Sequence, residues 1–244
     1  MIYSEGSAFM PEYDYISENI KSIREKIDNA AQKAGRDPKD VLLLAVSKTV
    51  DVPRIKAAVA EGLDELGENH VQEIMEKYEP MGPDVKWHMI GHLQTNKVKY
   101  IIDKVKLIHS VESLKLAEEI NKQAKKHGLV MDILVEINMA KEESKYGIMP
   151  EDAPAFIESL SSLENIRVRG LMTVAPNVEN GEENRVYFRN MKKLLVDINA
   201  KNINNINMDV LSMGMTGDYI TAVEEGATID RVGTGIFGKR NYNK

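Results

Sequence analysis

Short apolar segments alternate with helical segments along most of this chain, and the alternation restricts the fold more than any other feature. The clearest apolar segment is residues 41–46 (VLLLAV), which is short and continuous, as in a strand buried on both faces. Seven further candidate strands follow at residues 65–67, 86–90, 107–110, 131–137, 167–173, 208–212 and 228–232. Predicted helices lie between them at residues 55–60, 71–77, 96–102, 113–127, 151–160, 183–199 and 219–225. Eight β/α units in 244 residues predict a TIM-type (β/α)8 barrel, with an open doubly wound sheet as the alternative.

An additional helix is predicted before the first strand, over residues 12–34. Ile16, Ile20, Ile23 and Ile27 recur at helical spacing, and Gly35 is a natural end. Residues 1–12 are expected to form an irregular extension. No Pro/Gly/Ser-rich linker divides the chain, so residues 1–244 are predicted to form a single domain.

Composition excludes several classes of function. A hydrophobic fraction of 43% allows a sizeable core, and a net charge of -6 does not suit a nucleic-acid binder. The absence of cysteine excludes disulfides and thiolate chemistry, and the five histidines lack the spacing of a metal site. We find no nucleophile elbow and no Walker-type loop. With no leader-like start and no long apolar span, we expect a cytoplasmic protein without membrane contact.

Lys48 is the first candidate functional residue. It directly follows the apolar strand, and the active site of such a barrel lies at the carboxyl ends of its strands. If the strand continues, Lys48 shares a face with Leu44 and Val46 and points into the barrel mouth. Partial desolvation there favours a neutral, nucleophilic amine. The alternative is a lysine that extends into solvent or pairs with Glu68.

Two glycine-rich turns form the second feature, at residues 212–217 (SMGMTG) and 233–238 (GTGIFG). They follow predicted strands seven and eight, where barrels often bind a phosphate through backbone N–H groups and a helix N-terminus. Glycine lets the backbone approach the anion closely, and Ser212 and Thr234 could add hydroxyl donors. Thr216 or Asp218 is expected to cap the following helix. The alternative is a pair of tight turns without a ligand.

Arg231 is the third feature. It lies within the last strand on the same face as Ile229 and Gly233, whereas Asp230 points to the opposite face. A guanidinium directed into a barrel requires a partner. That partner is either a ligand atom or a carboxylate in a structural ion pair.

Seven motifs in fixed order give this chain a close resemblance to a known family. They are residues 43–49 (LLAVSKT), 67–69 (GEN) with Gln72 and Glu73, 87–94 (WHMIGHLQ) with Asn96 and Lys97, 145–147 (KYG), 169–172 (RGLM), 211–215 (LSMGM) and 231–238 (RVGTGIFG). From about Val41 to its end the chain resembles the pyridoxal phosphate homeostasis proteins, the YggS/PROSC group.

The resemblance implies a barrel similar to the N-terminal domain of alanine racemase, with pyridoxal 5′-phosphate (PLP) as cofactor. Lys48 would form a Schiff base with PLP, Asn69 would lie beside it, and Arg231 would approach the pyridine nitrogen. Ser212, Gly214, Gly233 and Thr234 would hold the phosphate, and Met213 is expected among the cofactor-binding residues. Met213 has core filling as its alternative role. The family often has Met-Ser-x-Asp where this chain has Met215-Thr-Gly-Asp218, and threonine retains the hydroxyl.

These features lead to an expected function. An arginine facing the pyridine nitrogen keeps the ring unprotonated, which weakens PLP as an electron sink. Racemisation needs acid/base groups on both faces of the substrate, and the β-rich domain that supplies one of them in alanine racemases is expected to be absent. We therefore expect a monomeric, non-catalytic PLP carrier or regulator, with PLP-dependent apoenzymes as candidate partners. The alternatives are a PLP-dependent amino-acid racemase or lyase, a cofactor-free Schiff-base aldolase for a sugar phosphate, and a barrel for an unknown small ligand.

Overall fold

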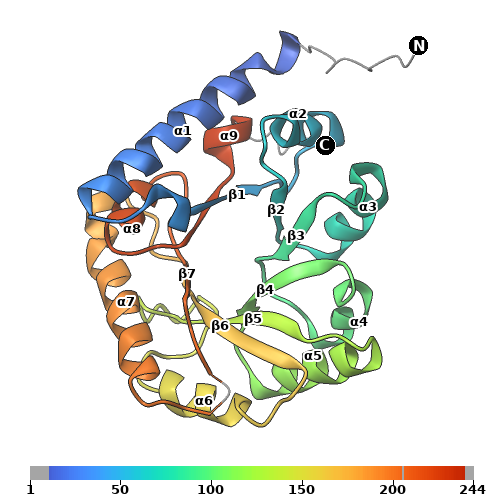
Figure 1. Ribbon diagram of the computed structural model, residues 1–244, viewed down its shortest axis with the longest axis vertical. Coiled ribbons are helices and arrows are strands. Elements are labelled where there is room, and N and C mark those ends of the chain that lie inside the picture. The colour runs from blue at the N-terminus through green and yellow to red at the C-terminus, as the bar shows by residue number, and fades with distance from the viewer. Residues whose placement is uncertain (1–10, 205, 240–244) are drawn as a thin grey trace.

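Eight parallel strands form a closed barrel in which each strand pairs with the next along the chain and β8 pairs with β1 (Figure 1). The computed structural model describes residues 11–204 and 206–239, so most of the extension expected at residues 1–12 lies outside the described residues. The strands are β1 (Leu42–Val46), β2 (Glu65–Glu68), β3 (Lys86–Met89), β4 (Val105–Val111), β5 (Met131–Glu136), β6 (Ile166–Met172), β7 (Val210–Ser212) and β8 (Ile229–Val232). Because β8 pairs with β1, the predicted barrel is confirmed and the alternative, an open doubly wound sheet, is wrong.

Helices surround the barrel and follow the strands in the predicted order. They are α1 (Asp14–Lys33), α2 (Val52–Ala60), α3 (Val71–Met81), α4 (Val98–Ile101), α5 (Leu114–Lys126), α6 (Ala153–Leu160), α7 (Arg185–Asn199), α8 (Tyr219–Glu224) and α9 (Thr234–Phe237). Short 3-10 helices occupy Pro11–Tyr13, Pro38–Asp40, Thr95–Lys97 and Gly181–Asn184. The helix predicted at residues 96–102 is thus a 3-10 turn followed by one α-helical turn, and α9 was not predicted.

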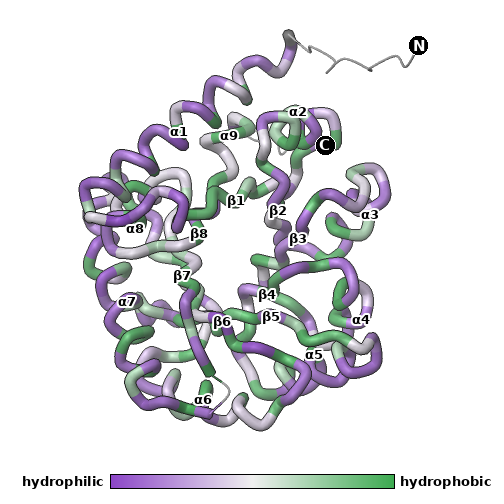
Figure 2. The backbone as a smooth tube through the Cα atoms, in the orientation of Figure 1, coloured by the Kyte–Doolittle hydropathy of each residue, from purple (hydrophilic) through white to green (hydrophobic). Residues whose placement is uncertain are grey.

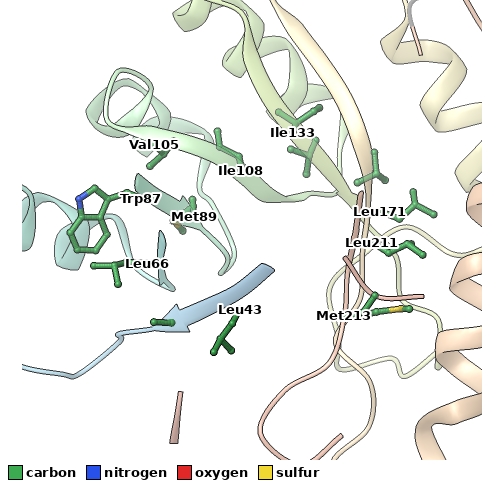
Figure 3. Close-up of a cluster of buried hydrophobic side chains, with 14 of the residues drawn as sticks. Leu43, Leu66, Trp87, Met89, Val105, Ile108, Ile133, Leu171, Leu211 and Met213 are labelled. Atoms are coloured by element: carbon green, nitrogen blue, oxygen red, sulfur yellow. The ribbon is translucent and has the colours of Figure 1, made fainter. Parts of the chain in front are cut away.

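Alternation along each strand divides the core into two layers. Outward-facing side chains pack between the strands and the helices, and this outer layer includes Leu43, Trp87, Ile108 and Met213 (Figure 3). Inward-facing apolar side chains form a smaller cluster inside the barrel: Leu44, Leu107, Leu134, Met172 and Ile229. The period of two in a strand therefore decides which residues face the barrel interior.

Helix α1 covers the outside of the barrel beside the junction of β1 and β8. Its buried isoleucines join the outer layer, and it packs against α2, α8 and α9 (Figure 1). Asn19 Nδ2 donates to the carbonyl oxygen of Ile236 in α9 at 3.0 Å. In Figure 2 the outer helices carry both hydrophilic and hydrophobic stretches, as amphipathic helices do. In the part of the chain that the structure describes, every helix is too short or too polar to cross a membrane.

Candidate functional site

Lys48 lies in the turn directly after β1, at the end of the barrel where all eight strands have their carboxyl ends. Its side chain is half-buried, between the fully buried Ser47 and the exposed Thr49. Thr49 has a φ of 60°, so the chain reverses sharply immediately after the lysine. The strand end and this turn place Lys48 at the barrel mouth, as predicted.

A buried cluster of charged side chains anchors the turn that carries Lys48. Lys77 Nζ of α3 donates to the Ser47 carbonyl oxygen at 2.9 Å and to Glu68 Oε1 at 2.8 Å. The Ser47 hydroxyl donates to the same Glu68 oxygen at 2.6 Å. Glu73 accepts from Lys77 at 2.8 Å and from the Thr49 backbone N–H at 2.7 Å. Burial raises the pKa of Glu68 to about 7, although Lys77 opposes the shift.

The two glycine-rich turns meet at the same end of the barrel. Thr234 Oγ1 donates to Thr216 Oγ1 at 3.1 Å, and the Gly235 backbone N–H donates to Thr216 Oγ1 at 3.2 Å. Both threonines are exposed, so two hydroxyl groups from different turns face solvent side by side. Thr216 thus lies with Thr234 on the open surface. It was predicted as a possible helix cap and as the residue that keeps the hydroxyl of the family's serine.

Asp218 holds the first of these turns in place. Its Oδ1 accepts from the Met215 backbone N–H at 2.7 Å, and its Oδ2 accepts from Asn184 Nδ2 at 2.7 Å. Gly214 has a φ of 89°, and its carbonyl oxygen accepts from the Arg231 backbone N–H at 3.0 Å. These bonds tie the turn after β7 to β8 and to the outer helices.

Arg231 points into the barrel and is almost fully buried. Its Nη1 donates to Ser212 Oγ at 2.7 Å, and its Nη2 donates to the Thr173 carbonyl oxygen at 2.8 Å. The neighbouring Asp230 faces the outer layer instead, and among the described residues neither of its carboxyl oxygens has a hydrogen-bond partner. Burial raises the pKa of Asp230 well above its usual range, so burial favours the protonated form of this carboxyl. The predicted opposite orientation of the two side chains is therefore confirmed.

Two residues expected to bind the cofactor, Ser212 at the phosphate and Met213 in the pocket lining, have other partners. The Ser212 hydroxyl lies between Arg231 and His109 Nδ1, which is 2.9 Å away, and the side chain is fully buried. The Met213 side chain packs in the outer layer, and its backbone N–H donates to the Ile229 carbonyl oxygen (Figure 3). Met213 therefore fills the core, and the Ser212 hydroxyl faces Arg231 and His109.

A pocket of about 590 Å³ opens on the other side of the mouth, after β2, β3, β5 and β6. Its lining includes Asn69, Lys97 and Lys145. Glu136 lies at its inner side, where burial, aided by Glu112, raises the pKa of its carboxyl to about 7 against the opposing effect of Arg231.

A stacked pair forms one wall of this pocket. The rings of His92 and Tyr146 lie 4.2 Å apart in nearly parallel planes, and His92 Nδ1 is 2.8 Å from Glu112 Oε1. Glu112 Oε2 accepts from the Gly147 backbone N–H at 3.0 Å. One glutamate therefore fixes both the histidine and the 145–147 turn that carries the tyrosine.

Three inward-facing polar residues were not predicted to belong to the site: Glu65, His109 and Glu136. His88, which also faces inward, lies in the motif at residues 87–94. Their orientation could have been predicted from the sequence, because alternate residues of a strand face the same side and each of these residues occupies an inward-facing position. Among the described residues, no group of His, Cys, Asp or Glu side chains is arranged to hold a metal ion.

The donor set suits a carbonyl compound that carries a phosphate. A lysine at a strand end can bond to a carbonyl carbon, and exposed hydroxyls between two glycine turns can donate to a phosphate. Fold and site together define a barrel of the alanine racemase N-terminal type. The family model for that domain, "Alanine racemase, N-terminal domain", matches residues 18–241.

Comparison with known proteins gives a more specific result. The chain is 44% identical over 226 residues to the pyridoxal phosphate homeostasis protein of Aquifex aeolicus, covering 92% of this chain and 98% of that protein. It is 39% identical over 229 residues to the homologue from Pseudomonas aeruginosa, covering 93% of this chain and 96% of that protein. The chain therefore belongs to the pyridoxal phosphate homeostasis protein family.

Solved structures agree with this assignment. PipY of Synechococcus elongatus, solved with PLP bound, is similar with a TM-score of 0.79 and 34% identity, covering 91% of this chain and 100% of that chain. An alanine racemase from Clostridium difficile has a TM-score of 0.71 at 19% identity, with 95% of this chain matching 58% of that one. The racemase likeness supports the barrel fold alone.

Proposed function

We propose that this protein binds PLP at the barrel mouth, covalently through Lys48, and acts as a PLP carrier or regulator. The observation that carries the proposal is the convergence of Lys48, the Thr216–Thr234 hydroxyl pair and the inward Arg231 at one end of the barrel. The structure of PipY with PLP bound and the name of the family support the same ligand.

Each residue would serve one part of the cofactor. Thr216, Thr234 and the backbone of the Gly214 and Gly233 turns would hold the phosphate, and Asn69 would border the ring from the β2 side. Arg231 would face the pyridine nitrogen, and because a guanidinium keeps its protons, it would leave that nitrogen unprotonated. PLP itself supplies an aldehyde that bonds reversibly to amines, and a protonated ring is what makes it a strong electron sink.

The same residues favour storage over turnover. With Arg231 holding the ring unprotonated, the chain would bind the cofactor without promoting carbanion chemistry at an amino acid. Reversible attachment to Lys48 would permit delivery to an apoenzyme.

The experiment is an absorbance spectrum of the purified protein with PLP, followed by borohydride reduction and mass spectrometry. The wild type is expected to show a near-visible band and a cofactor-modified Lys48, and Lys48→Ala is expected to show neither. Lys56→Ala, an exposed lysine on α2, is the matched control and should behave like the wild type. A wild-type protein that takes up no PLP would overturn the proposal.

Turnover separates the carrier from its enzymatic rival. The proposal expects no robust racemase or lyase activity when the PLP-loaded protein is incubated with a panel of amino acids. Activity that disappears in Lys48→Ala would instead establish a PLP-dependent enzyme.

A further inference from the structure

An unbroken chain of buried polar side chains crosses the barrel interior and ends on Arg231. We call its five members, Glu65, His88, His109, Ser212 and Arg231, the inner chain. Arg231 Nη1 is 2.7 Å from Ser212 Oγ, which is 2.9 Å from His109 Nδ1. His109 Nε2 is 2.9 Å from His88 Nδ1, and His88 Nε2 is 2.7 Å from Glu65 Oε2. The inner chain therefore links β8, β7, β4, β3 and β2 through side chains alone.

The two ends of the inner chain differ in charge and in place. Glu65 begins β2, so it lies at the end of the barrel opposite Lys48, where Lys106 Nζ donates to its second oxygen at 2.7 Å. Burial alone would raise the pKa of Glu65, but hydrogen bonds from His88 and Lys106 outweigh it and lower the pKa to about 2. The inner chain thus runs from a carboxylate at the base to a guanidinium at the mouth.

These ends fix the direction of every hydrogen bond between them. Burial lowers the pKa of His88, and the positive charge of Lys106 lowers it further. Burial also lowers the pKa of His109 well below the usual range, and the positive charge of Arg231 adds to this shift. Both rings are therefore neutral near pH 7, with one donor and one acceptor each. A carboxylate only accepts, so His88 donates from Nε2 and accepts at Nδ1, and His109 likewise donates from Nε2. The Ser212 hydroxyl then donates to His109 and accepts from Arg231.

A structural role alone does not account for this arrangement. Most of the other inward-facing side chains are apolar, such as Leu44, Leu107 and Ile229, and barrel interiors are usually filled in this way. Buried polar groups destabilise a protein unless each finds a partner, and apolar replacements of similar volume are often neutral or stabilising. The feature that apolar residues could not provide is a fixed orientation of Arg231.

We propose that Glu65, His88, His109 and Ser212 are positioning residues for Arg231, and that the inner chain thereby determines how firmly the protein holds the ring end of its cofactor. This inference rests on the proposed function for the identity of the ligand. The direction of the hydrogen bonds is independent of the ligand.

Histidine tautomers test the direction in the PLP-free protein. In long-range 1H–15N spectra of 15N-histidine protein, His88 and His109 are expected as neutral rings protonated at Nε2, with signals assigned through His88→Gln and His109→Gln. An imidazolium at either position, or a proton on Nδ1 of either ring, would overturn the proposed arrangement.

Cofactor binding tests the consequence. His109→Leu, which is close to histidine in volume, should weaken PLP binding about tenfold, corresponding to about 1.4 kcal/mol. It should also shift the signal of 15N-labelled pyridine nitrogen while leaving the 31P signal of the phosphate unchanged. His109→Gln keeps one donor and one acceptor and should recover part of the affinity. Leu107→Met, at the adjacent inward position of β4, is the matched control and should bind as the wild type does.

Glu65→Gln provides a second test from the far end of the inner chain. It keeps an acceptor for His88 but removes the charge that sets the direction, so it should move the pyridine-nitrogen signal and weaken binding about threefold. Its control is Glu61→Gln, the same substitution at an exposed glutamate that follows α2. Equal PLP affinity and an unchanged ring signal in His109→Leu and Glu65→Gln would overturn this inference alone. Absence of PLP binding by the wild type would overturn the proposed function as well.

Discussion

Gly214 is required both by its backbone conformation and by its neighbours. Its φ is 89°, and an added Cβ would lie 2.6 Å from Asp230 Oδ1 and 2.7 Å from the Ala222 Cβ. We expect Gly214→Ala to lower the free energy of unfolding by about 2 kcal/mol or more, through backbone strain and overpacking. Urea unfolding measures the change.

Gly217→Ala is the matched control in the same turn. A Cβ at Gly217 would meet no heavy atom within 4 Å, so its effect should stay within about 0.5 kcal/mol. Equal stability of the two variants would show that the Gly214 turn adapts to a side chain.

The buried carboxyl of Glu136 makes the stability of the folded protein depend on pH. Its pKa of about 7 in the folded protein exceeds the value of an unfolded glutamate, so the folded state binds a proton more tightly. Stability from this group is therefore present at low pH and is lost as the pH rises from about 4.5 to about 7.

Glu136→Gln should remove this dependence. At pH 5 the PLP-free variant and wild type should unfold with similar free energies. At pH 8 the variant should be more stable by about 1–3 kcal/mol, because it no longer buries an ionised carboxylate. Urea unfolding at several pH values measures the two free energies. If they change with pH in the same way for both proteins, the pKa of Glu136 is not raised as described.

At the scale of elements, the turn after β1 depends on α3. Lys77 binds Ser47, Glu68 and Glu73 with little exposure, so its charge neutralises a buried carboxylate beside Lys48. We expect Lys77→Met to lower the free energy of unfolding by about 3–5 kcal/mol, because a buried charge loses its partner. It should also weaken PLP binding by loosening the turn that carries Lys48.

Lys33→Met is the control for Lys77→Met. Lys33 pairs with Glu224 at 2.7 Å, but its side chain is 74% exposed, so its loss should cost less than about 1 kcal/mol. Urea unfolding of both variants measures their free energies of unfolding. An equally small decrease in Lys77→Met would mean that backbone hydrogen bonds alone hold the turn after β1.

The elements themselves were largely predictable, and the exceptions have a physical cause. Strand β1 and helix α1 have apolar patterns long and regular enough to identify from the residues. The 3-10 turn before α4 and the four-residue α9 are too short to have a periodicity, and their conformation follows from contacts with the barrel.

At the scale of the whole molecule, closure of the barrel leaves no sheet edge open for another chain within residues 11–204 and 206–239. Strand β8 pairs with β1 along four residues of register, so both would-be edge strands are hydrogen-bonded. We therefore expect a monomer in solution. Light scattering coupled to size exclusion should give a mass near 27.4 kDa with and without PLP, and a concentration-dependent increase in mass would contradict this expectation.

The sequence by itself determined the barrel, its single-domain organisation and the position of Lys48 at a strand end, because alternating apolar periods and strand-end residues are local properties of the chain. Tertiary structure alone decided that Ser212 lies between Arg231 and His109, that Met213 faces the outer layer, and that Thr216 meets Thr234. Each of these contacts joins residues from different strands or turns, and their distances depend on barrel closure and register. The periodicity of single strands could indicate that Glu65, His88 and His109 face inward, but only the closed barrel brings them within hydrogen-bond distance.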